Sequence, residues 1–170
     1  MRAVFRAPIR LYDAGFGWML GTRFLCLTHV GRKSGRQYRT VLEVVGTRPS
    51  AGEFMVVAGF GRSSDWYRNI EAAPAWLVVV GRHRFVPRYR VLGEAEAVEV
   101  IGDYERRNCW VLPLVPFLLS RLLGWRYDGS TDARRRLVGQ LPVVAFRPTG
   151  ELGATAPREC ATRQLRGDVP

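Results

Sequence analysis

A short basic turn between two apolar runs constrains this chain more than any other stretch. Residues 31–36 read Gly-Arg-Lys-Ser-Gly-Arg, and the two glycines let the backbone turn tightly. The runs on either side, residues 24–30 and 40–45, are strand-like and mostly apolar. The pattern predicts a β-hairpin whose tip offers cations, a hydroxyl and backbone N–H groups to an anion. A solvated turn is the alternative for this stretch taken alone, and the spacing is not that of a P-loop.

The size and charge of the chain limit the classes of protein to which it can belong. Its 170 residues suit one domain, and a hydrophobic content of 47% suffices for a buried core. The formal net charge is +11, from 26 Lys and Arg against 15 Asp and Glu. This charge favours an anionic partner, such as a phosphorylated cofactor, an acidic membrane surface or nucleic acid. Nucleic-acid binding is the least supported, because neither an aromatic sheet motif nor a recognition helix accompanies the charge.

The cysteines and histidines indicate neither a disulfide framework nor a metal site. Cys26, Cys109 and Cys160 are scattered and odd in number, and His29 and His83 stand far apart in the sequence. We expect Cys26 and Cys109 to be unreactive core thiols, and we expect no metal. The sequence has no recognisable signal peptide and no apolar run of about 18 residues, so we expect a cytoplasmic protein without a membrane span.

Alternating apolar residues, turn residues and prolines predict a small antiparallel β-barrel of the α+β class. We expect strands near residues 23–30, 39–47, 53–59, 75–80, 83–92 and 141–147. Pro87 is expected to mark an edge or a bulge within the fifth of these. We expect helices over residues 8–21, 64–72 and 95–109, and one or two helical turns over 134–140. Because the strands are mostly consecutive and joined by turns, an antiparallel barrel with a few flanking helices follows.

Three further segments lie outside this barrel pattern. We expect a single domain over residues 1–148 and a disordered tail over 149–170, where the hydrophobic periodicity is lost. The helix over 8–21 carries an apolar stripe that either packs on the sheet or touches a membrane surface peripherally. The proline-interrupted apolar stretch 110–123 is either a core helix or the cover of a lipophilic pocket.

A second candidate site lies at residues 58–69, where a strand ends in a glycine-rich bend before a helix. One of the two serines before that helix is expected to cap it, and Asp65 is expected in its first turn. The amino end of a helix binds anions and carbonyl groups well. Trp66 and Tyr67 are adjacent, so we expect one ring to pack inward and the other to line a pocket.

No acid–base pair or activated nucleophile is recognisable in the sequence. Glu94, Glu96 and Glu99 are expected on a solvated face of the third helix. The sequence has no Gly-x-Ser-x-Gly elbow and no evident Cys/His pairing. If the protein is an enzyme, a bound cofactor therefore carries the reaction, and the chain supplies binding and electrostatics.

Together, the basic turn and the later Trp66-Tyr67-x-Asn69 helix, followed by Ala-Pro and a valine-rich strand, resemble the deazaflavin-dependent nitroreductase family. The resemblance covers about residues 8–148. It implies a split β-barrel that binds coenzyme F420. It also implies an oxidoreductase that passes a hydride from the reduced deazaflavin to a small electron-poor acceptor, such as a quinone, an activated enone or a nitroaromatic compound. Such a protein is a monomer or a homodimer.

The resemblance also implies which residues hold the cofactor. In the family, the basic turn binds the phosphate and oligoglutamate tail, the next segment borders the ring with backbone groups, a strand end lies along the ring, and the helix start closes the site. The cofactor-binding residues implied here are Arg32, Lys33, Ser34, Tyr38, Arg39, Thr40, Val41, Leu42, Ala58, Gly59, Phe60, Asp65, Trp66, Tyr67 and Asn69. Tyr104 and Tyr127 are the candidates for donating a proton to the acceptor or contacting it.

Three positions depart from the family pattern. Gln37-Tyr38 stand where many relatives have Pro-Arg, Val41 replaces a proline, and Gly59-Phe60 replace a Ser-Lys type pair. These departures leave the tail site in place and bear on the acceptor pocket. Two alternatives stay open: a protein of the same fold that binds FMN, and a non-catalytic carrier of the deazaflavin or of a lipophilic ligand.

Overall fold

The structure is a computed structural model that describes residues 21–108, 120 and 123–149. The expected helix over 8–21, the apolar stretch 110–123 and the tail over 149–170 lie outside the described residues, apart from Gly21, Ser120, Leu123 and Thr149.

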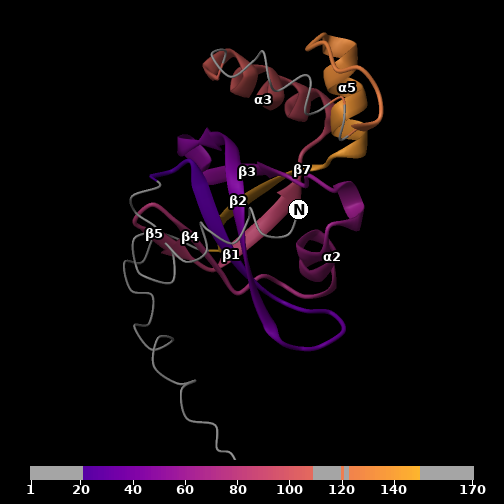
Figure 1. Ribbon diagram of the computed structural model, residues 1–170. Coiled ribbons are helices and arrows are strands. Elements are labelled where there is room, and N and C mark those ends of the chain that lie inside the picture. Colours follow the sequence, from indigo (N-terminus) through magenta and orange to yellow (C-terminus); the bar gives the residue numbers. More distant parts are fainter. Residues whose placement is uncertain (1–20, 109–119, 121–122, 150–170) are drawn as a thin grey trace, which may run out of the picture.

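Seven strands form one antiparallel sheet in the order β5-β4-β1-β2-β3-β7-β6 (Figure 1). The strands are β1 (Phe24–Val30), β2 (Gln37–Arg48), β3 (Glu53–Val57), β4 (Leu77–Val80), β5 (His83–Phe85), β6 (Pro87–Val91) and β7 (Val143–Pro148). The helices are α2 (Asp65–Ala72), α3 (Glu94–Arg107) and α5 (Thr131–Gln140), with short 3-10 turns η2 (Pro49–Ala51) and η3 (Gly61–Ser63). This arrangement confirms the predicted split antiparallel barrel with flanking helices.

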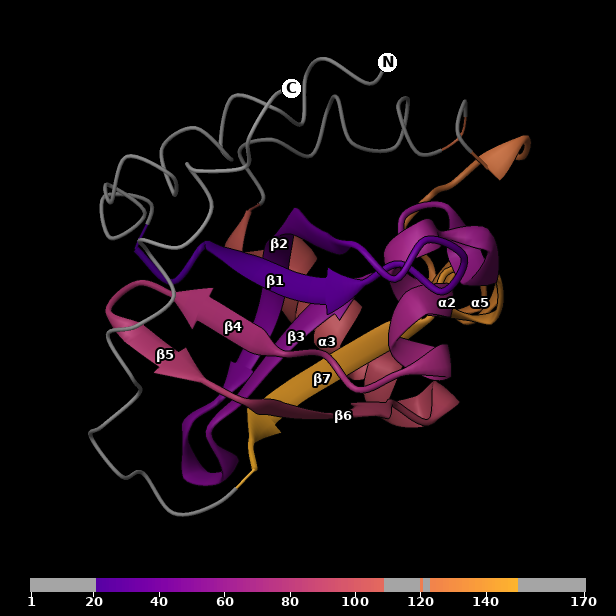
Figure 2. The same ribbon diagram turned by 90° about the horizontal axis from the view of Figure 1, so that it is seen from below.

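The sheet curls into a nearly closed barrel whose two edge strands, β5 and β6, are consecutive in the chain (Figure 2). β5 pairs with β4, and β6 pairs with β7, while only Val86 separates β5 from β6. Pro87 lacks the N–H that would continue pairing, and the chain changes partner there, as predicted for this position. The long strand β2 belongs to both halves of the barrel, and a register shift between Val44 and Gly46 bends it from β1 toward β3.

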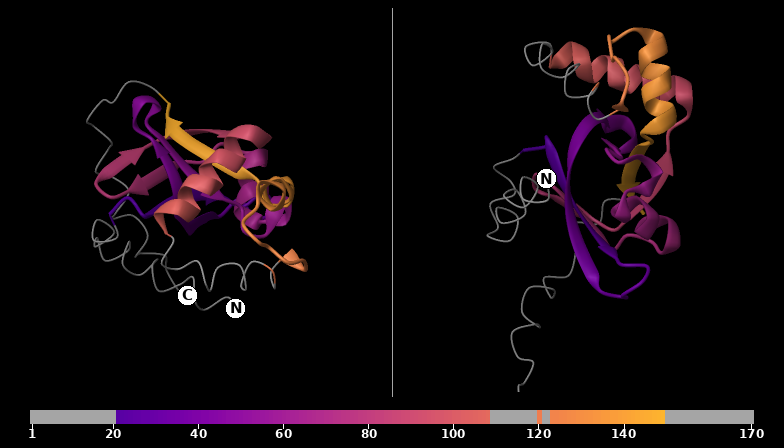
Figure 3. Two further views of the ribbon diagram at one scale, coloured as in Figure 1. Left: turned by 90° about the horizontal axis from the view of Figure 1, so that it is seen from above. Right: turned by 45° about the vertical axis from the view of Figure 1, so that its right-hand side comes forward.

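Two apolar clusters occupy the two faces of the strands β3 and β7. Alternate residues point inward, and Val56, Val144 and Phe146 belong to the barrel interior. Their neighbours Met55, Val143 and Ala145 point outward and pack against α3 and α5. Figure 3 shows α3 and α5 together at one end of the barrel, and the tip of the β1–β2 hairpin at the other end.

The predicted elements are largely confirmed, and their bounds shift by a few residues. Residues 83–92 form two strands instead of one, so the described chain has seven strands where six were expected. The expected turns over 134–140 are a ten-residue helix that begins at Thr131. That helix starts earlier because the Ser130 hydroxyl accepts a hydrogen bond from the Ala133 N–H at 3.1 Å and caps it. Cys26 is fully buried, as expected for a core thiol.

The expectation that Glu96 lies on a solvated helix face is wrong. Glu96 pairs with Arg48 and Arg90, each at 2.7 Å, and Arg90 also pairs with the buried Glu53 at 2.8 Å. Arg48 completes the group through a 3.3 Å contact with Glu53. This four-residue network ties the start of α3 to the barrel. A helical pattern alone could not show it, because three of the four partners come from strands.

No helix among the described residues is long and apolar enough to cross a membrane.

Candidate cofactor site

The basic turn folds into a compact hairpin tip held by its own backbone. The N–H groups of Ser34 and Gly35 donate to the Gly31 carbonyl, at 3.2 and 2.8 Å. Gly35 has a φ of +65°, a conformation that favours glycine. A Cβ on Gly31 would lie 2.5 Å from the ring of Tyr38, so the first glycine lets that ring lie against the turn. The Tyr38 and Ser34 hydroxyls are hydrogen-bonded at 3.1 Å.

Arg32 joins the hairpin tip to the amino end of α2. Its guanidinium contacts the Asp65 carboxylate at 3.1 Å and donates to the Asn69 side-chain oxygen at 3.0 Å. The Arg32 backbone N–H donates to the same Asn69 oxygen at 3.1 Å. The two stretches singled out in the sequence therefore meet in one place. Asn69 is buried, so this junction is partly shielded from water.

A histidine beneath the tip completes the junction. His29 lies on the inward face of β1 and is only 3% exposed. Its Nδ1 is 3.1 Å from the Asn69 amide nitrogen, and its Nε2 is 3.1 Å from the Thr40 hydroxyl. Burial lowers the pKa of His29, and the Val30 backbone and the nearby Asp65 oppose that shift only partly. From the sequence, His29 was considered only as a metal ligand. The alternation of side chains in β1 turns His29 inward together with Leu25 and Leu27, and this alternation could have indicated that His29 is buried.

The start of α2 differs from expectation in two ways. Trp66 and Tyr67 are both buried, at 8% and 2% exposed, and their rings meet edge to face at 5.8 Å in the barrel core. The expectation that one of them lines a pocket is therefore wrong, because the barrel end is wide enough to take two adjacent rings. Ser64 occupies the N-cap position, but its side chain makes no capping bond, and its buried hydroxyl has no hydrogen-bond partner among the described residues. Asp65 lies in the first turn, as predicted.

Two exposed cations at the tip are available to an anion. Lys33 and Arg36 are exposed, and among the described residues their side chains form no hydrogen bond or ion pair. Arg32, by contrast, is occupied by Asp65 and Asn69. The first N–H groups of α2 add donors beside the tip. This donor set fits a long, multiply charged anion.

The segment 38–42 follows the tip along β2, and its side chains divide between two faces. Tyr38, Thr40 and Leu42 share the face of β2 that points into the barrel, because Leu42 packs against the inner core. Arg39 and Val41 lie on the opposite face, where Val41 packs against Cys26. The structure therefore does not bring these five side chains together.

The backbone of the same segment has a free edge. β2 pairs with β1 over residues 37–43, while its pairing with β3 begins only at Val44. The Val44 N–H donates to the Arg23 carbonyl on the β1 side, so by alternation the N–H and C=O of Val41 point away from β1. No strand among the described residues pairs with β2 on that side at Val41, which is compatible with the backbone contacts that the family resemblance implies.

The strand end at Ala58, Gly59 and Phe60 lies between β3 and α2. Ala58 is fully buried and its N–H donates to the Pro142 carbonyl at 2.9 Å, so its side chain belongs to the core. Gly59 is exposed, with open space where a Cβ would be, and Phe60 is 64% exposed. An exposed phenylalanine beside an open glycine offers a flat apolar surface to a ring.

The two tyrosines proposed to serve the acceptor lie with α3 and α5, at the other end of the barrel from the tip. The Tyr104 hydroxyl donates to the Glu43 carboxylate at 2.8 Å, and burial together with Glu43 raises the pKa of Tyr104 to about 12. Tyr127 is 3% exposed and its hydroxyl donates to the buried Glu105, which raises the pKa of Tyr127 further. The structure does not bring Tyr127 near the hairpin tip. Tyr104 borders a cleft of about 250 Å³ beside β2 and the end of α3.

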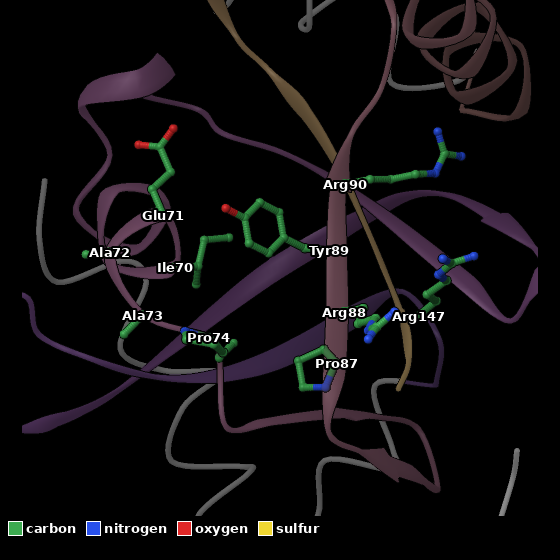
Figure 4. Close-up of a pocket in the computed structure, with 11 residues that line it drawn as sticks. Ile70, Glu71, Ala72, Ala73, Pro74, Pro87, Arg88, Tyr89, Arg90 and Arg147 are labelled. Carbon is green, nitrogen blue, oxygen red and sulfur yellow. The ribbon is translucent and has the colours of Figure 1, made fainter. Parts of the chain in front are cut away.

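A larger cleft of about 490 Å³ lies on another side of α2, between residues 70–75 and β6 (Figure 4). Tyr89 points from β6 across this cleft toward Ile70 and Glu71, whereas Arg90 and Arg147 extend away from α2. None of the residues implied as cofactor ligands lines it. The cofactor-binding residues assigned from the sequence therefore line neither this cleft nor the smaller one beside Tyr104.

One protein family and several solved structures are similar to this chain. A family described as F420H(2)-dependent quinone reductase matches residues 6–113. No curated protein matches the chain. Among solved structures, an F420-H2 dependent reductase named FDR-A is similar at 21% identity over 75% of this chain and 96% of its own, with a TM-score of 0.45.

Two other solved structures are similar at comparable levels. One, described as a domain-swapped dimer, shares 20% identity over 84% of this chain and 95% of its own, with a TM-score of 0.48. The other is the protein Atu2129, of unknown function, from Agrobacterium tumefaciens. It shares 17% identity over 87% of this chain and 56% of its own, with a TM-score of 0.49.

The family match spans more than half of the chain and includes the hairpin tip, β2, the strand end at 58–60 and all of α2. It confirms the resemblance drawn from the basic turn and the Trp66-Tyr67-x-Asn69 helix. The protein is an oxidoreductase that belongs to the F420H2-dependent quinone reductase family.

Proposed function

We propose that this protein binds coenzyme F420 with its tail at the hairpin tip, and reduces a small electron-poor acceptor such as a quinone, an activated enone or a nitroaromatic compound. The observation that carries the proposal is the junction of Arg32 with Asp65 and Asn69, which sets a cationic turn beside the amino end of α2. When bound, the reduced deazaflavin supplies a hydride. The chain supplies position and charge. We place this activity in the cytoplasm, in a monomer or homodimer.

In this proposal the tip residues bind the F420 tail by their charge, and they hold the turn in its binding conformation before the cofactor arrives. Lys33 and Arg36 face solvent and neutralise the phosphate and carboxylate groups of the tail. Arg32 holds the turn against α2 and cancels the negative charge of Asp65, which would otherwise repel the tail. Uncommitted N–H groups at the start of α2 add donors, and the helix dipole favours an anion there.

The ring lies, in this proposal, along the free edge of β2 and the surface formed by Gly59 and Phe60. The backbone groups of Val41 orient its polar edge, and Phe60 covers an apolar face and excludes water. Tyr104 lies closer to this edge than Tyr127, through its bond to Glu43. With a pKa raised to about 12, Tyr104 stays protonated at neutral pH and donates its hydroxyl hydrogen to Glu43, which leaves the hydroxyl oxygen to accept a hydrogen bond.

The proposal is tested with a variant that removes the two exposed tip charges, Lys33→Ala with Arg36→Ala. F420 titrated into this double variant is expected to bind at least about tenfold more weakly than to the wild type, because two charge-assisted contacts are lost. Arg32 is left intact, since removing it would also free the tip from α2. The matched control is Arg82→Ala with Arg84→Ala, which removes two exposed charges from the β4–β5 turn and β5.

Equal loss of affinity in both double variants would mean that overall charge, and not the tip, binds the cofactor. FMN titrated in parallel separates the flavin alternative, and is expected to bind far more weakly than F420. Steady-state oxidation of reduced F420 by a panel of quinones, enones and nitroarenes separates a reductase from a carrier. No turnover with any of them would favour the carrier.

A further inference from the structure

His29 is the buried centre of a chain of hydrogen bonds that ends at the hairpin tip. This series of hydrogen bonds joins the Thr40 hydroxyl to His29 Nε2 and His29 Nδ1 to the Asn69 amide nitrogen. Its last member joins the Asn69 side-chain oxygen to the Arg32 backbone N–H. The three links measure 3.1 Å each, and a fourth contact of 3.0 Å joins the Asn69 oxygen to the Arg32 guanidinium. His29 thus links β1, β2, α2 and the turn.

The donors and acceptors in this chain permit only one arrangement. The Asn69 side-chain oxygen has two partners, the backbone N–H and the guanidinium of Arg32, and both can only donate a hydrogen bond. The Asn69 amide nitrogen therefore faces His29, and it also can only donate. His29 Nδ1 must accept, so the ring is neutral and carries its proton on Nε2, which donates to the Thr40 hydroxyl. The position of Arg32 and the tautomer of His29 are fixed together.

A second proton on His29 breaks this arrangement. Nδ1–H would face the donor amide of Asn69, and turning the amide around would set its nitrogen against the two donors of Arg32. The first case breaks the bond between His29 and Asn69, and the second, in which the turned amide accepts from Nδ1–H, breaks the bonds from Arg32 to Asn69. The groups facing the ring agree with a neutral state: Arg32 contributes a positive charge, Thr40 and Asn69 are neutral, and the ring of Tyr38 stacks on it at 6.1 Å. The Val30 backbone and the exposed Asp65 favour the charged ring, and burial outweighs both.

We propose that His29 is a positioning residue: through Asn69 it fixes Arg32 and sets the hairpin tip in the geometry that binds an anionic tail. The proposal rests on the function proposed above for its effect on the cofactor. It has one consequence of its own. Protonation of His29 releases Arg32 from Asn69, so the tip binds the tail less tightly in acid, although the added positive charge alone would act in the opposite direction.

The first measurement follows the Arg32 backbone amide by NMR and needs no cofactor. In His29→Leu, which has no acceptor for Asn69, the Arg32 amide resonance is expected to move from its wild-type position at about pH 7.5. In His29→Asn, whose side-chain oxygen can replace Nδ1 as the acceptor, it is expected to stay close to the wild-type position. As the wild type is acidified below the ordinary histidine pKa of about 6.5, the resonance is expected to shift, whereas in His29→Asn it should not.

The second measurement is the affinity for F420 over the same pH range. The wild type is expected to lose at least about threefold in affinity between about pH 7.5 and about pH 5, beyond any change shown by the non-titrating His29→Asn variant, because the ordered tip is lost. Titration of the cofactor itself is common to both proteins and cancels in the comparison. His29→Leu is expected to bind weakly throughout, and His29→Asn to restore most of the affinity.

The two measurements distinguish failure of this inference from failure of the cofactor assignment. If Arg32 responds to His29 as expected while F420 does not bind at any pH, the positioning role stands and the proposed function fails. An Arg32 amide that is the same in the wild type and His29→Leu, and does not respond to pH, overturns the positioning role. A higher F420 affinity in acid, in the wild type alone, would show that the charge of His29 acts directly and not through Asn69.

Discussion

At the scale of single residues, Gly61 shows how closely the site is joined to the rest of the molecule. Its φ is +61°, and a Cβ there would lie 2.7 Å from the Gln140 carbonyl oxygen at the end of α5. Gly61 is buried and begins the 3-10 turn that leads into α2. The backbone of the loop before the candidate site therefore packs directly on the end of a helix from the other cluster.

Gly61→Ala is expected to lower the free energy of unfolding by about 2 kcal/mol or more. The alanine would be strained at positive φ and would also press on a backbone atom that cannot easily move. Gly59→Ala is the matched control from the same loop, because Gly59 is exposed and has open space where its Cβ would lie. Urea unfolding of the two variants measures the difference, and equal stability in both would contradict the close packing at Gly61.

Single residues were the hardest part to predict from the sequence. The tip cations follow from residue type and spacing, Asn69 was implied by the family resemblance, and the structure brings Arg32 and Asn69 together. His29 could not be assigned, because its role depends on α2 meeting the end of β1, which no local pattern encodes. The inward packing of both Trp66 and Tyr67 likewise depends on how wide the barrel is at that end.

At the scale of elements, α3 is attached to the barrel by charge as well as by apolar packing. Its first turn places Glu96 between Arg48 and Arg90, while Ala97 and Ile101 pack on the outer face of the sheet. The two arginines lower the pKa of Glu96 to about 2. This attachment fixes the start of the helix, and the apolar residues fix the rest.

Glu96→Gln is expected to cost about 1–3 kcal/mol of stability, since it leaves Arg48 and Arg90 to share Glu53 as their one charged partner in the network. Glu99→Gln, an exposed change on the same helix, is expected to cost no more than about 0.5 kcal/mol. The pH dependence has a definite sign. The pKa of Glu96 is about 2 in the folded protein and 4.5 ordinarily, so its contribution is complete above pH 4.5 and is lost as the pH falls toward 2.

Urea titrations of the wild type and both variants, from neutral pH downward, measure this contribution. The gap in stability between the wild type and Glu96→Gln should narrow below about pH 4.5, while the gap to Glu99→Gln stays small at each pH. A gap that is unchanged in acid would mean that Glu96 acts through packing and not through its charge.

Most elements could be predicted because their signals are local. Alternation located β1, β2 and β3, and Pro87 marked the place where the chain passes from one edge of the sheet to the other. The true start of α5 was missed because Ser130 caps it within a polar stretch that shows little periodicity. The sequence predicted a barrel but not the order of its strands. That order includes the pairing of β3 with β7, which joins residues about ninety positions apart.

At the scale of the whole molecule, one pair of strands serves two cores. The inward residues of β3 and β7 fill the barrel together with Leu25, Leu27 and Val78, and their outward residues carry α3 and α5. The hairpin tip and α2 belong to the barrel core, because Trp66, Tyr67 and Ile70 lie in it. The candidate site should therefore depend on the inner core much more than on the outer one.

Leu137→Ala, in the outer core, is expected to destabilise the protein by about 2–4 kcal/mol, because it leaves a cavity between α5 and the sheet. Hydrogen exchange should show the amides of α5 losing more protection than those of β1 and β4, since the helix pair can open while the barrel stays closed. F420 affinity should remain within about twofold of the wild type. Val78→Ala, a similar loss in the inner core, should instead lower protection across the barrel and weaken F420 binding. If Leu137→Ala reduced protection equally in α5 and in β1, the two clusters would be one cooperative unit, and the site would depend on both.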